Sequence, residues 1–503
     1  MISVPYLLAE LERRGIILFL ADGEMRYRSP KDALTPVDRD ALKARRAEIV
    51  AFLAARDAAK GLRATRGAPG PLTPSVVQEM WWRFAGAPDE GKPVALNIGM
   101  VGTFPGHDAV AVTAAIHELM RRHEALRASF TADGDTLHAA SRSADDFAVG
   151  QEDMRGLGTE AGQAATQSAQ AFCALLNPIL GEWLTRAKVI ALPEGAMAVL
   201  SSAHMIADAG TRNIVIEELR NILEGKAAAP SVPYNDYSLG ERQFLAGPQG
   251  VSLIGYWRDW YAAQPTMTAP SDGAPLLWGC GTRIVRNFHI PRRVMERVRT
   301  LAGELKVTPF LIGLTIFATA MARWSGKADF PIRVLGDKRT AMDLTNTVGL
   351  MFCADAVAIH ASPGASFESV LRGIQLEYDA ALSRRIPTLH FYAPQMVRPG
   401  IEPRGFPNKI PAVFNYYSVG TAQEKADKSE APDLSADWPW PPQVAELPAA
   451  HWPRVSSPLF LHLMDYGSEA AASLHFYADV IGAADRDSFQ ATLFAVFDEV
   501  LPA

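Results

Sequence analysis

Cysteines, long hydrophobic runs and clustered metal ligands are all scarce in this 503-residue chain. Its three cysteines, Cys173, Cys280 and Cys353, lie far apart, which excludes a disulfide scaffold or a CxxC metal site and is typical of a reducing compartment. No apolar run approaches the ~20 residues that span a bilayer, and no signal peptide is evident. We therefore expect a cytoplasmic protein with no membrane partner.

Patterns for metal, nucleotide and nucleic-acid binding are also missing. The sequence has no HExxH, no GxxxxGK[ST] and no strand-linked GxGxxG, and its 11 histidines are scattered. We therefore expect no bound metal or nucleotide. The net charge of −6 lacks the basic balance of a nucleic-acid-binding protein. A 48% hydrophobic composition and this length instead predict a globular protein of several domains.

Residues 1–60 are expected to form a small helix–hairpin–helix domain. Apolar residues at helical spacing predict a first helix over 4–11. Asp22–Gly23 suits the turn of a β-hairpin whose strands are 16–20 and 24–28. Thr35–Pro36 begins a second helix. The apolar stripe of that helix is Leu42, Ile49 and Leu53.

This first domain differs from the rest of the chain in charge. It holds 11 Lys and Arg against 9 Asp and Glu. The basic excess gathers around the hairpin and second helix, at Arg26, Arg28, Lys31, Lys43, Arg45 and Arg46. These residues form either a solvated face or a dock for an acidic peptide. An exposed strand at 26–28 could accept an added strand while basic groups steer the partner.

A Pro- and Gly-containing linker at 61–71 follows. From residue 72 onward, strand-like and helical stretches alternate, which indicates an α/β layered fold. One segment, 420–451, is rich in Pro, Ala and acidic residues and is expected to be a long loop.

The most informative stretch is 197–211, where an apolar run ends in His204 and Asp208 follows before a helical pattern. A histidine at the end of a strand can face a cleft and accept or relay a proton near neutral pH. Asp208 could turn back and fix the loop. No Ser or Cys elbow such as GxSxG stands beside it, which favours direct attack by an amine or hydroxyl on an activated acyl group. An isolated HxxxD pair arises by chance too often to assign a function.

The HxxxD pair becomes informative when it is taken with other segments of the chain. Together, and in the family's order, these segments resemble the condensation domain of nonribosomal peptide synthetases over 72–503. They are 71–74 with Gln78 and Trp81, 122–130 (similar to RHExLRTxF), 203–209 (similar to HHxxxDG), 234–237 with 256–257 (similar to YxDY…YW), 307–310, 323–326, 337–339 with 348–349, and 414–416. Residues 1–60 resemble the TubC-type, or β-hairpin, docking domain, which receives a short acidic tail from an upstream carrier-bearing protein.

The resemblance implies two chloramphenicol-acetyltransferase-like lobes in a V, here 72–240 and 241–503, with His204 in a central tunnel. His204 would be catalytic, orienting or deprotonating the acceptor, and Asp208 would be structural, paired with Arg339. Ala203 and Asn415 would lie along the tunnel. The donor would be an acyl or peptidyl thioester on the phosphopantetheine of a partner carrier protein, so this chain would bind no cofactor itself.

Three positions depart from the family pattern: Ala203 replaces the first motif histidine, Ala209 replaces the motif glycine, and Gly240 replaces a tryptophan. The added methyl of Ala209 could narrow the acceptor side or restrict the backbone. These changes point to an unusual acceptor or to reduced activity.

The sequence ends without an adenylation or carrier domain, so we expect a free-standing, monomeric condensation enzyme that passes a chain to a small hydroxyl or amine acceptor. Such an enzyme is similar to the ester-forming, chain-releasing kind that ends some polyketide pathways, enacyloxin's among them. Two alternatives stay open: a CoA-dependent acyltransferase, whose plant DFGWG motif is not found, and a degenerate domain that recruits a partner to a carrier protein.

Overall fold

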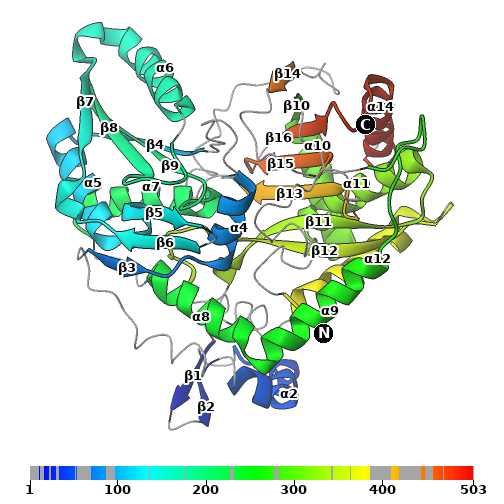
Figure 1. Cartoon of the computed structure of the whole chain (residues 1–503). Coiled ribbons are helices and arrows are strands. Elements are labelled where there is room, and N and C mark those ends of the chain that lie inside the picture. Colours follow the sequence, from blue (N-terminus) through cyan, green and yellow to red (C-terminus); the bar gives the residue numbers. More distant parts are fainter. Residues whose placement is uncertain are drawn as a thin grey trace. The chain divides into compact units, whose positions relative to one another are not determined.

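The computed structural model describes residues 11, 16–21, 24–29, 33–50, 53, 69–85, 97–134, 136–175, 177–226, 231–276, 282–340, 344–362, 364–385, 409–418, 443–447, 457–467 and 469–501. The chain divides into two compact units (Figure 1). The N-terminal unit comprises Ile2–Ser252 and Asp337–Phe352, and the C-terminal unit comprises Leu253–Gly336 and Cys353–Ala503.

This division differs from the lobe boundary predicted at 240/241. The helix α8 (Tyr234–Ala246) carries Glu241, whose carboxylate accepts hydrogen bonds from the backbone N–H of Val76, at 2.8 Å, and from Lys338 Nζ, at 3.0 Å. These contacts hold residues beyond 240, and the returning segment that begins at Asp337, within the N-terminal unit.

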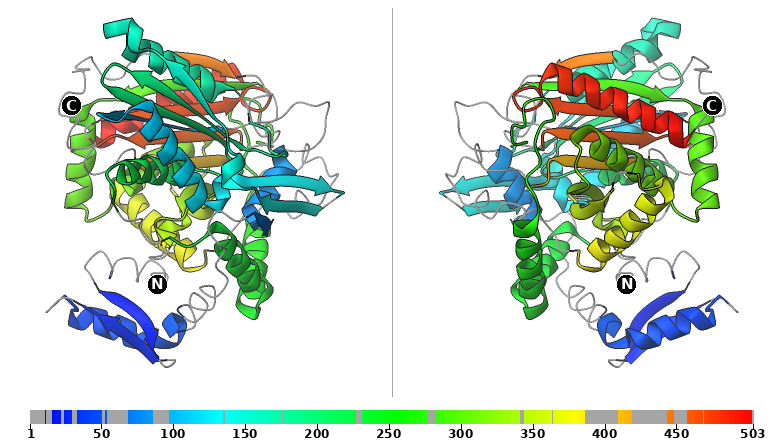
Figure 2. Two further views of the ribbon diagram at one scale, coloured as in Figure 1. Left: turned by 90° about the vertical axis from the view of Figure 1, so that its left-hand side faces the viewer. Right: turned by 90° about the vertical axis from the view of Figure 1, so that its right-hand side faces the viewer.

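The small N-terminal domain has the expected hairpin and second helix. Strands β1 (Ile17–Ala21) and β2 (Glu24–Arg28) pair antiparallel. Helix α2 (Pro36–Ala44) begins after Thr35, whose hydroxyl accepts from the N–H of Asp38 at 3.2 Å, while the Asp38 carboxylate accepts from the N–H of Thr35 at 2.8 Å. Hairpin and helix lie beside each other (Figure 2) over a common core. That core comprises Leu11, Ile16, Leu18, Leu34, Leu42, Ile49 and Leu53.

Of the predicted first helix only Leu11 falls within the described residues, and most of the linker lies outside them. The linker is shorter than predicted, because Gly70 and Pro71 already belong to strand β3 (Gly70–Leu72), which pairs with β6.

Two sheets form the rest of the N-terminal unit. The larger has the order β4-β9-β8-β7 and the smaller β3-β6-β5. The remaining strands are β4 (Asn97–Pro105), β5 (Ala128–Asp133), β6 (Thr136–Ser141), β7 (Val149–Asp153), β8 (Thr185–Leu192) and β9 (Gly195–Ala203). The helices, including 3-10 turns, are α4 (Val76–Ala85), α5 (Ala109–Arg122), η2 (Glu124–Arg127), η3 (Ala144–Asp146), η4 (Arg155–Glu160), α6 (Ala161–Ala174), α7 (Ala209–Leu223) and η5 (Lys338–Thr340).

The C-terminal unit contains one seven-stranded mixed sheet of order β12-β11-β13-β15-β16-β10-β14. Its strands are β10 (Arg283–Ile290), β11 (Asp329–Asp337), β12 (Phe352–His360), β13 (Ala412–Ser418), β14 (Gln443–Leu447), β15 (Leu459–Asp465) and β16 (Ala470–Tyr477). Its helices are α9 (Pro248–Ala263), which begins in the other unit, α10 (Arg292–Glu304), α11 (Pro309–Ser325), α12 (Phe367–Ser383) and α14 (Ala483–Val500).

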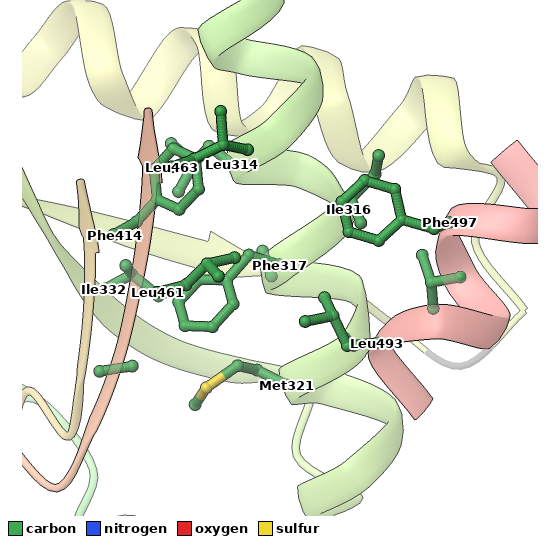
Figure 3. Packing of buried hydrophobic residues seen from close by; sticks show 14 of the residues in the cluster. Leu314, Ile316, Phe317, Met321, Ile332, Phe414, Leu461, Leu463, Leu493 and Phe497 are labelled. Atoms are coloured by element: carbon green, nitrogen blue, oxygen red, sulfur yellow. The ribbon is translucent and has the colours of Figure 1, made fainter. Parts of the chain in front are cut away.

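Helix α11 is the centre of this unit's core (Figure 3). Phe317 stacks on Phe414 of β13, with ring centroids 5.8 Å apart, and Leu493 and Phe497 of α14 belong to the same cluster. Most α11 side chains are buried, because the helix has apolar residues on nearly every face.

One predicted loop contains a strand. Within 420–451, Gln443–Leu447 forms β14, which pairs antiparallel with β10, so the expectation of a continuous loop is wrong for these five residues. Their backbone hydrogen bonds to the edge of an existing sheet outweigh the local composition on which the loop was predicted. The rest of that segment lies outside the described residues.

Within the described part of the chain, no single helix is long and apolar enough to cross a membrane. The pair α10 and α11 reaches that length and apolarity only together, and it is bent by 102°. The described residues contain no group of three or more His, Cys, Asp or Glu that could hold a metal ion.

Candidate active site

His204 follows directly after the last residue of the buried strand β9. The strand stays paired with β4 up to Ala203, whose N–H then donates to Leu184 O at 2.8 Å. A tight turn begins there, closed by the N–H of Ile206 to Ala203 O at 3.0 Å. Gln78 on α4 donates from Nε2 to Met205 O at 3.1 Å. The loop that carries His204 is therefore fixed on one side by the end of β9 and on the other by the hydrogen bond from Gln78 to its backbone.

The imidazole of His204 lies against two aromatic rings of the same unit. Its centroid is 4.8 Å from the ring of Trp81 and 6.0 Å from that of Phe352. Burial lowers the pKa of His204, opposed in part by backbone groups of His204 and Ala207 and by the charge of Asp208. A pKa below the ordinary value leaves the imidazole neutral at pH 7, the form that can accept a proton.

Asp208 is occupied by structural contacts. Oδ1 caps α7 by accepting from the N–H of Thr211 at 2.8 Å, and Oδ2 accepts from the N–H of Met351 at 2.6 Å. The predicted pair with Arg339 is present, with Nη2 2.9 Å from Oδ1. Burial alone would raise the pKa of Asp208, but the charge and hydrogen bonds of Arg339, with those two N–H groups, lower it. The carboxylate is therefore ionised and serves the loop.

Arg339 is itself held by several acceptors. Nε donates to Thr347 O at 2.7 Å, Nη2 to Gly349 O at 2.8 Å and to Thr211 Oγ1 at 3.0 Å, and Nη1 to Asp337 at 3.1 Å. A buried guanidinium with all these partners recovers much of the hydration that it loses. The network ties the start of α7 to the segment Asp337–Phe352.

The glycine that this site needs is Gly210, which the sequence analysis did not single out. A Cβ built there would lie 2.8 Å from Asp337 Oδ2 and closer still to Nη1 of Arg339. The Arg339 side chain cannot move aside cheaply, because its hydrogen bonds fix it. In this chain the position that leaves no room for a side chain is thus Gly210, one residue beyond Ala209, which is the half-buried first residue of α7.

The structure places the two predicted tunnel residues in different units. The side chain of Ala203 is fully buried in an apolar cluster with Trp82, Phe130 and Leu184, at the end of a strand whose residues after the first are all buried. Its position along a tunnel stays a prediction. Asn415 lies half-buried on β13 of the C-terminal unit, with Nδ2 3.4 Å from His462 Nε2.

Residues of the segments 122–130 and 234–237 make hydrogen bonds that stabilise the elements around the His204 loop. His123 Nε2 lies 2.5 Å from Glu218 Oε2 on α7, and Glu124 accepts from the N–H of Asn235 at 2.8 Å. The hydroxyl of Tyr234 lies 2.8 Å from Ser75 Oγ and donates to Leu350 O at 2.9 Å. These contacts fix α7, α8 and the returning segment around the His204 loop.

The predicted docking residues lie on the small N-terminal domain. Arg26 and Arg28 are exposed on β2, and Arg28 also lies 5.3 Å over the ring of Phe19. Lys43 and Arg46 are exposed on the second helical segment and Arg45 is half-buried. Lys31 lies outside the described residues.

Two of these arginines are partly neutralised within the domain. Arg45 donates from Nε to Glu48 at 3.1 Å, and Arg46 pairs with Glu24 on β2. Both arginines therefore hold an acidic partner within the domain.

The α/β fold, the histidine at a strand end and the buried Asp–Arg pair agree with the resemblance to condensation domains, and comparison with known proteins shows that family. A condensation-domain model matches residues 77–388, and a TubC N-terminal docking domain model matches 4–54. The chain belongs to the condensation-domain family, with an N-terminal TubC docking domain. Condensation domains of synthetases are acyltransferases that form amide or ester bonds, so both the predicted class of enzyme and the predicted α/β fold are confirmed.

Three relatives illustrate the similarity. The solved condensation domain that mediates chain release from the enacyloxin polyketide synthase is 33% identical, covers 100% of this chain and 97% of that one, and has a TM-score of 0.76. The EpoB cyclization-docking bidomain from Sorangium cellulosum (19% identical, 99% of this chain, 98% of that one, TM-score 0.62) shares the fold. Phosphinothricin tripeptide synthetase PhsC from Streptomyces viridochromogenes is 27% identical over 63% of this chain, which spans only 30% of that synthetase.

The close approach at Gly210 leads to a first prediction. Gly210→Ala should displace Arg339 from Asp208 and lower the unfolding temperature, by a destabilisation of about 1–3 kcal/mol typical of overpacking. The control is Gly240→Ala on α8, where a Cβ meets nothing within 4 Å. That change should stabilise the helix by about 0.5–1 kcal/mol. Equal effects of the two substitutions in thermal unfolding would contradict the packing argument.

The depressed pKa of Asp208 leads to a second prediction, on pH dependence. Asp208→Asn leaves Arg339 buried without its charge partner and should cost about 3–5 kcal/mol at pH 7. A carboxylate whose pKa is lower in the folded state contributes its full stability above its ordinary unfolded pKa of about 3.9 and loses it as pH falls through the folded value.

The difference between wild type and Asp208→Asn in urea unfolding should therefore be constant near neutral pH and shrink below about pH 4. Asp153→Asn, which removes an exposed pair with Arg155, is the control and should have little effect on stability. A difference that stays the same down to pH 3 would show that the charge of Asp208 is not what stabilises the loop.

Proposed function

We propose that this protein transfers an acyl or polyketide/peptide chain from the phosphopantetheine thioester of a partner carrier protein to a hydroxyl or amine of a small acceptor, and so releases the chain. The observation that carries this proposal is the imidazole of His204, presented at a strand end against two aromatic rings while Asp208 is committed to Arg339; burial also lowers its pKa. The site thus holds one imidazole base, and its carboxylate is not available for proton transfer.

The reaction needs little more than that base. As the acceptor oxygen or nitrogen attacks the thioester carbonyl, His204 takes its proton. The new C–O or C–N bond forms, the C–S bond breaks on collapse of the tetrahedral intermediate, and the proton passes to the departing thiolate. No covalent acyl-enzyme is required, which agrees with the absence of a GxSxG elbow in the sequence.

Ester formation is the preferred outcome within this proposal. It is supported by 33% identity, over the whole chain, to a condensation domain that mediates chain release from a polyketide synthase. That similarity favours a small, non-amino-acid acceptor with a hydroxyl nucleophile.

The carrier protein would be selected at the docking domain. Strand β2 pairs with β1 in a two-stranded sheet, and Arg26, Tyr27 and Arg28 are exposed on it. An acidic C-terminal tail on the carrier-bearing partner could add as a further strand, with its carboxylates near Arg26, Arg28 and Lys43. Backbone hydrogen bonds would supply affinity, and the basic side chains would supply selectivity and rate of association.

A third prediction concerns His204. A carrier protein loaded with a model acyl thioester is incubated with the enzyme and a panel of small amines and alcohols, and intact-protein mass spectrometry follows acyl loss. Wild type should discharge the carrier with product formation, and His204→Ala should slow this by about 10²–10⁴-fold, the usual contribution of a general base. His117→Ala on α5, a half-buried histidine outside the site, is the control and should keep wild-type activity.

The other outcomes discriminate among functions. Turnover from acyl-CoA but not from the carrier would establish a CoA-dependent acyltransferase. A bound carrier with no turnover from either donor would establish a recruitment module. Product with alcohols and not amines would assign ester formation.

A fourth prediction concerns docking. Arg26→Glu with Arg28→Glu should raise the KM for a carrier bearing an acidic tail by roughly tenfold or more and leave kcat unchanged, because only association is affected. Arg293→Glu with Arg297→Glu, a pair of exposed arginines on α10, is the charge-matched control. A specific dock on β2 would be refuted if both double variants raised the KM equally. It would also be refuted if the β2 double variant kept the wild-type KM with the tailed carrier as well as with a carrier that lacks the tail.

A further inference from the structure

The imidazole of His204 is enclosed by aromatic rings from two other elements. Trp81 on α4 lies with its ring centroid 4.8 Å from the imidazole at an interplanar angle of 40°. Phe352, the first residue of β12, lies 6.0 Å away at 64°, and the Trp81 and Phe352 rings meet edge-on at 6.3 Å and 78°. All three residues belong to the N-terminal unit. We call these two rings the aromatic clamp.

Helix α4 holds the His204 loop at two points. Gln78, buried one turn before Trp81, donates to Met205 O at 3.1 Å, and also accepts from the N–H of Ser75 at 2.9 Å. Residues three apart share one face of a helix. The same face of α4 therefore fixes the loop backbone through Gln78 and meets the adjacent imidazole through Trp81.

We propose, building on the function above, that Trp81 is a positioning residue for His204: together with Phe352, which contacts both rings, the indole holds the imidazole in one orientation and shields a ring face from water, so that the acceptor reaches the imidazole through its edge. The edge carries the ring nitrogens, and hydrogen bonds to them lie in the ring plane. A covered face therefore costs nothing in proton transfer and restricts the direction of approach.

The causes of the lowered pKa of His204 agree with the proposal that the rings shield its imidazole from water. Asp208, on the same loop, favours the charged imidazolium, and an aromatic face also attracts a cation. Trp81, Gln78 and Phe352 carry no ionisable group, and the charged residue that the returning segment brings to the loop, Arg339, is paired with Asp208 and Asp337. The net pKa of His204 is nevertheless lowered, with burial as the largest cause. Exclusion of water thus outweighs both attractions, and Trp81 lies near enough to supply much of that exclusion.

The test compares Trp81→Leu and Trp81→Phe with wild type. Removing the ring should admit water and let the pKa of His204 rise toward its ordinary value of about 6.5, where about three quarters of the imidazole is charged at pH 6. The kcat/KM of Trp81→Leu should then fall about fourfold at pH 6 relative to pH 8, beyond any change in wild type. Trp81→Phe, which keeps a ring, should restore most of the wild-type profile.

Trp183→Leu is the matched control, because Trp183 is another half-buried tryptophan of the same unit that packs on Phe147, at 5.1 Å. It should leave the pH profile unchanged. The titration is also followed directly, by NMR of ¹³C-labelled histidine with His204 assigned through His204→Gln. This titration needs no substrate. It therefore tests the effect of Trp81 on the pKa of His204 even if the wild type transfers no acyl group and the proposed function fails.

An unchanged His204 titration in a folded Trp81→Leu variant would overturn the proposal. A uniform loss of activity at every pH, with the titration unmoved, would do the same and would assign Trp81 a packing role. If Trp81→Leu does not fold, Phe352→Leu removes the second ring and is held to the same criteria: a raised pKa of His204 supports the clamp, and an unmoved one refutes it.

Discussion

The buried ion pair between Asp208 and Arg339 is the contact on which the geometry around His204 depends. Its two members lie far apart in sequence, one at the start of α7 and the other beyond β11, yet Nη2 and Oδ1 are 2.9 Å apart. Ions out of water stabilise a fold only when nearly all their hydrogen-bonding capacity is used. Thr211, Met351, Thr347 and the peptide oxygen of residue 349 meet that condition here.

This arrangement separates two tasks that one carboxylate–histidine pair often combines. Asp208 is saturated by a guanidinium and two peptide N–H groups, so its hydrogen bonds serve the loop, and it acts on the imidazole through its charge, which favours the protonated form. His204 depends instead on uncharged surroundings, the rings of Trp81 and Phe352 and the buried end of β9. A base tuned by exclusion of water needs no neighbouring charge, and its strength then depends on how well the rings around it are packed.

The sequence predicted features that local physics controls. The hairpin with its Asp–Gly turn, the Thr35 cap and the placement of His204 after a buried strand each depend on a few consecutive residues. The pairing of Asp208 with Arg339 was predictable only through the order of the family motifs.

What the sequence could not predict rests on contacts between distant segments. Gly210 must lack a side chain because Arg339 passes beside it, and Trp81 matters because α4 packs on the His204 loop. Strand β14 forms because β10 offers it an edge. The return of Asp337–Phe352 to the N-terminal unit likewise follows from tertiary contacts and leaves no mark in composition or periodicity.

That return has a consequence for recombination between related genes. The polypeptide passes from one unit to the other at 252/253, at 336/337 and again at 352/353. A single crossover at 252/253 would therefore join an Asp208 from one parent to an Arg339 from another, together with a foreign copy of the segment that surrounds it. Exchanges of whole C-terminal segments take the ion-pair network from one parent when the joint falls before Asp208 or after residue 352, so residues 208–352 are best inherited as one block.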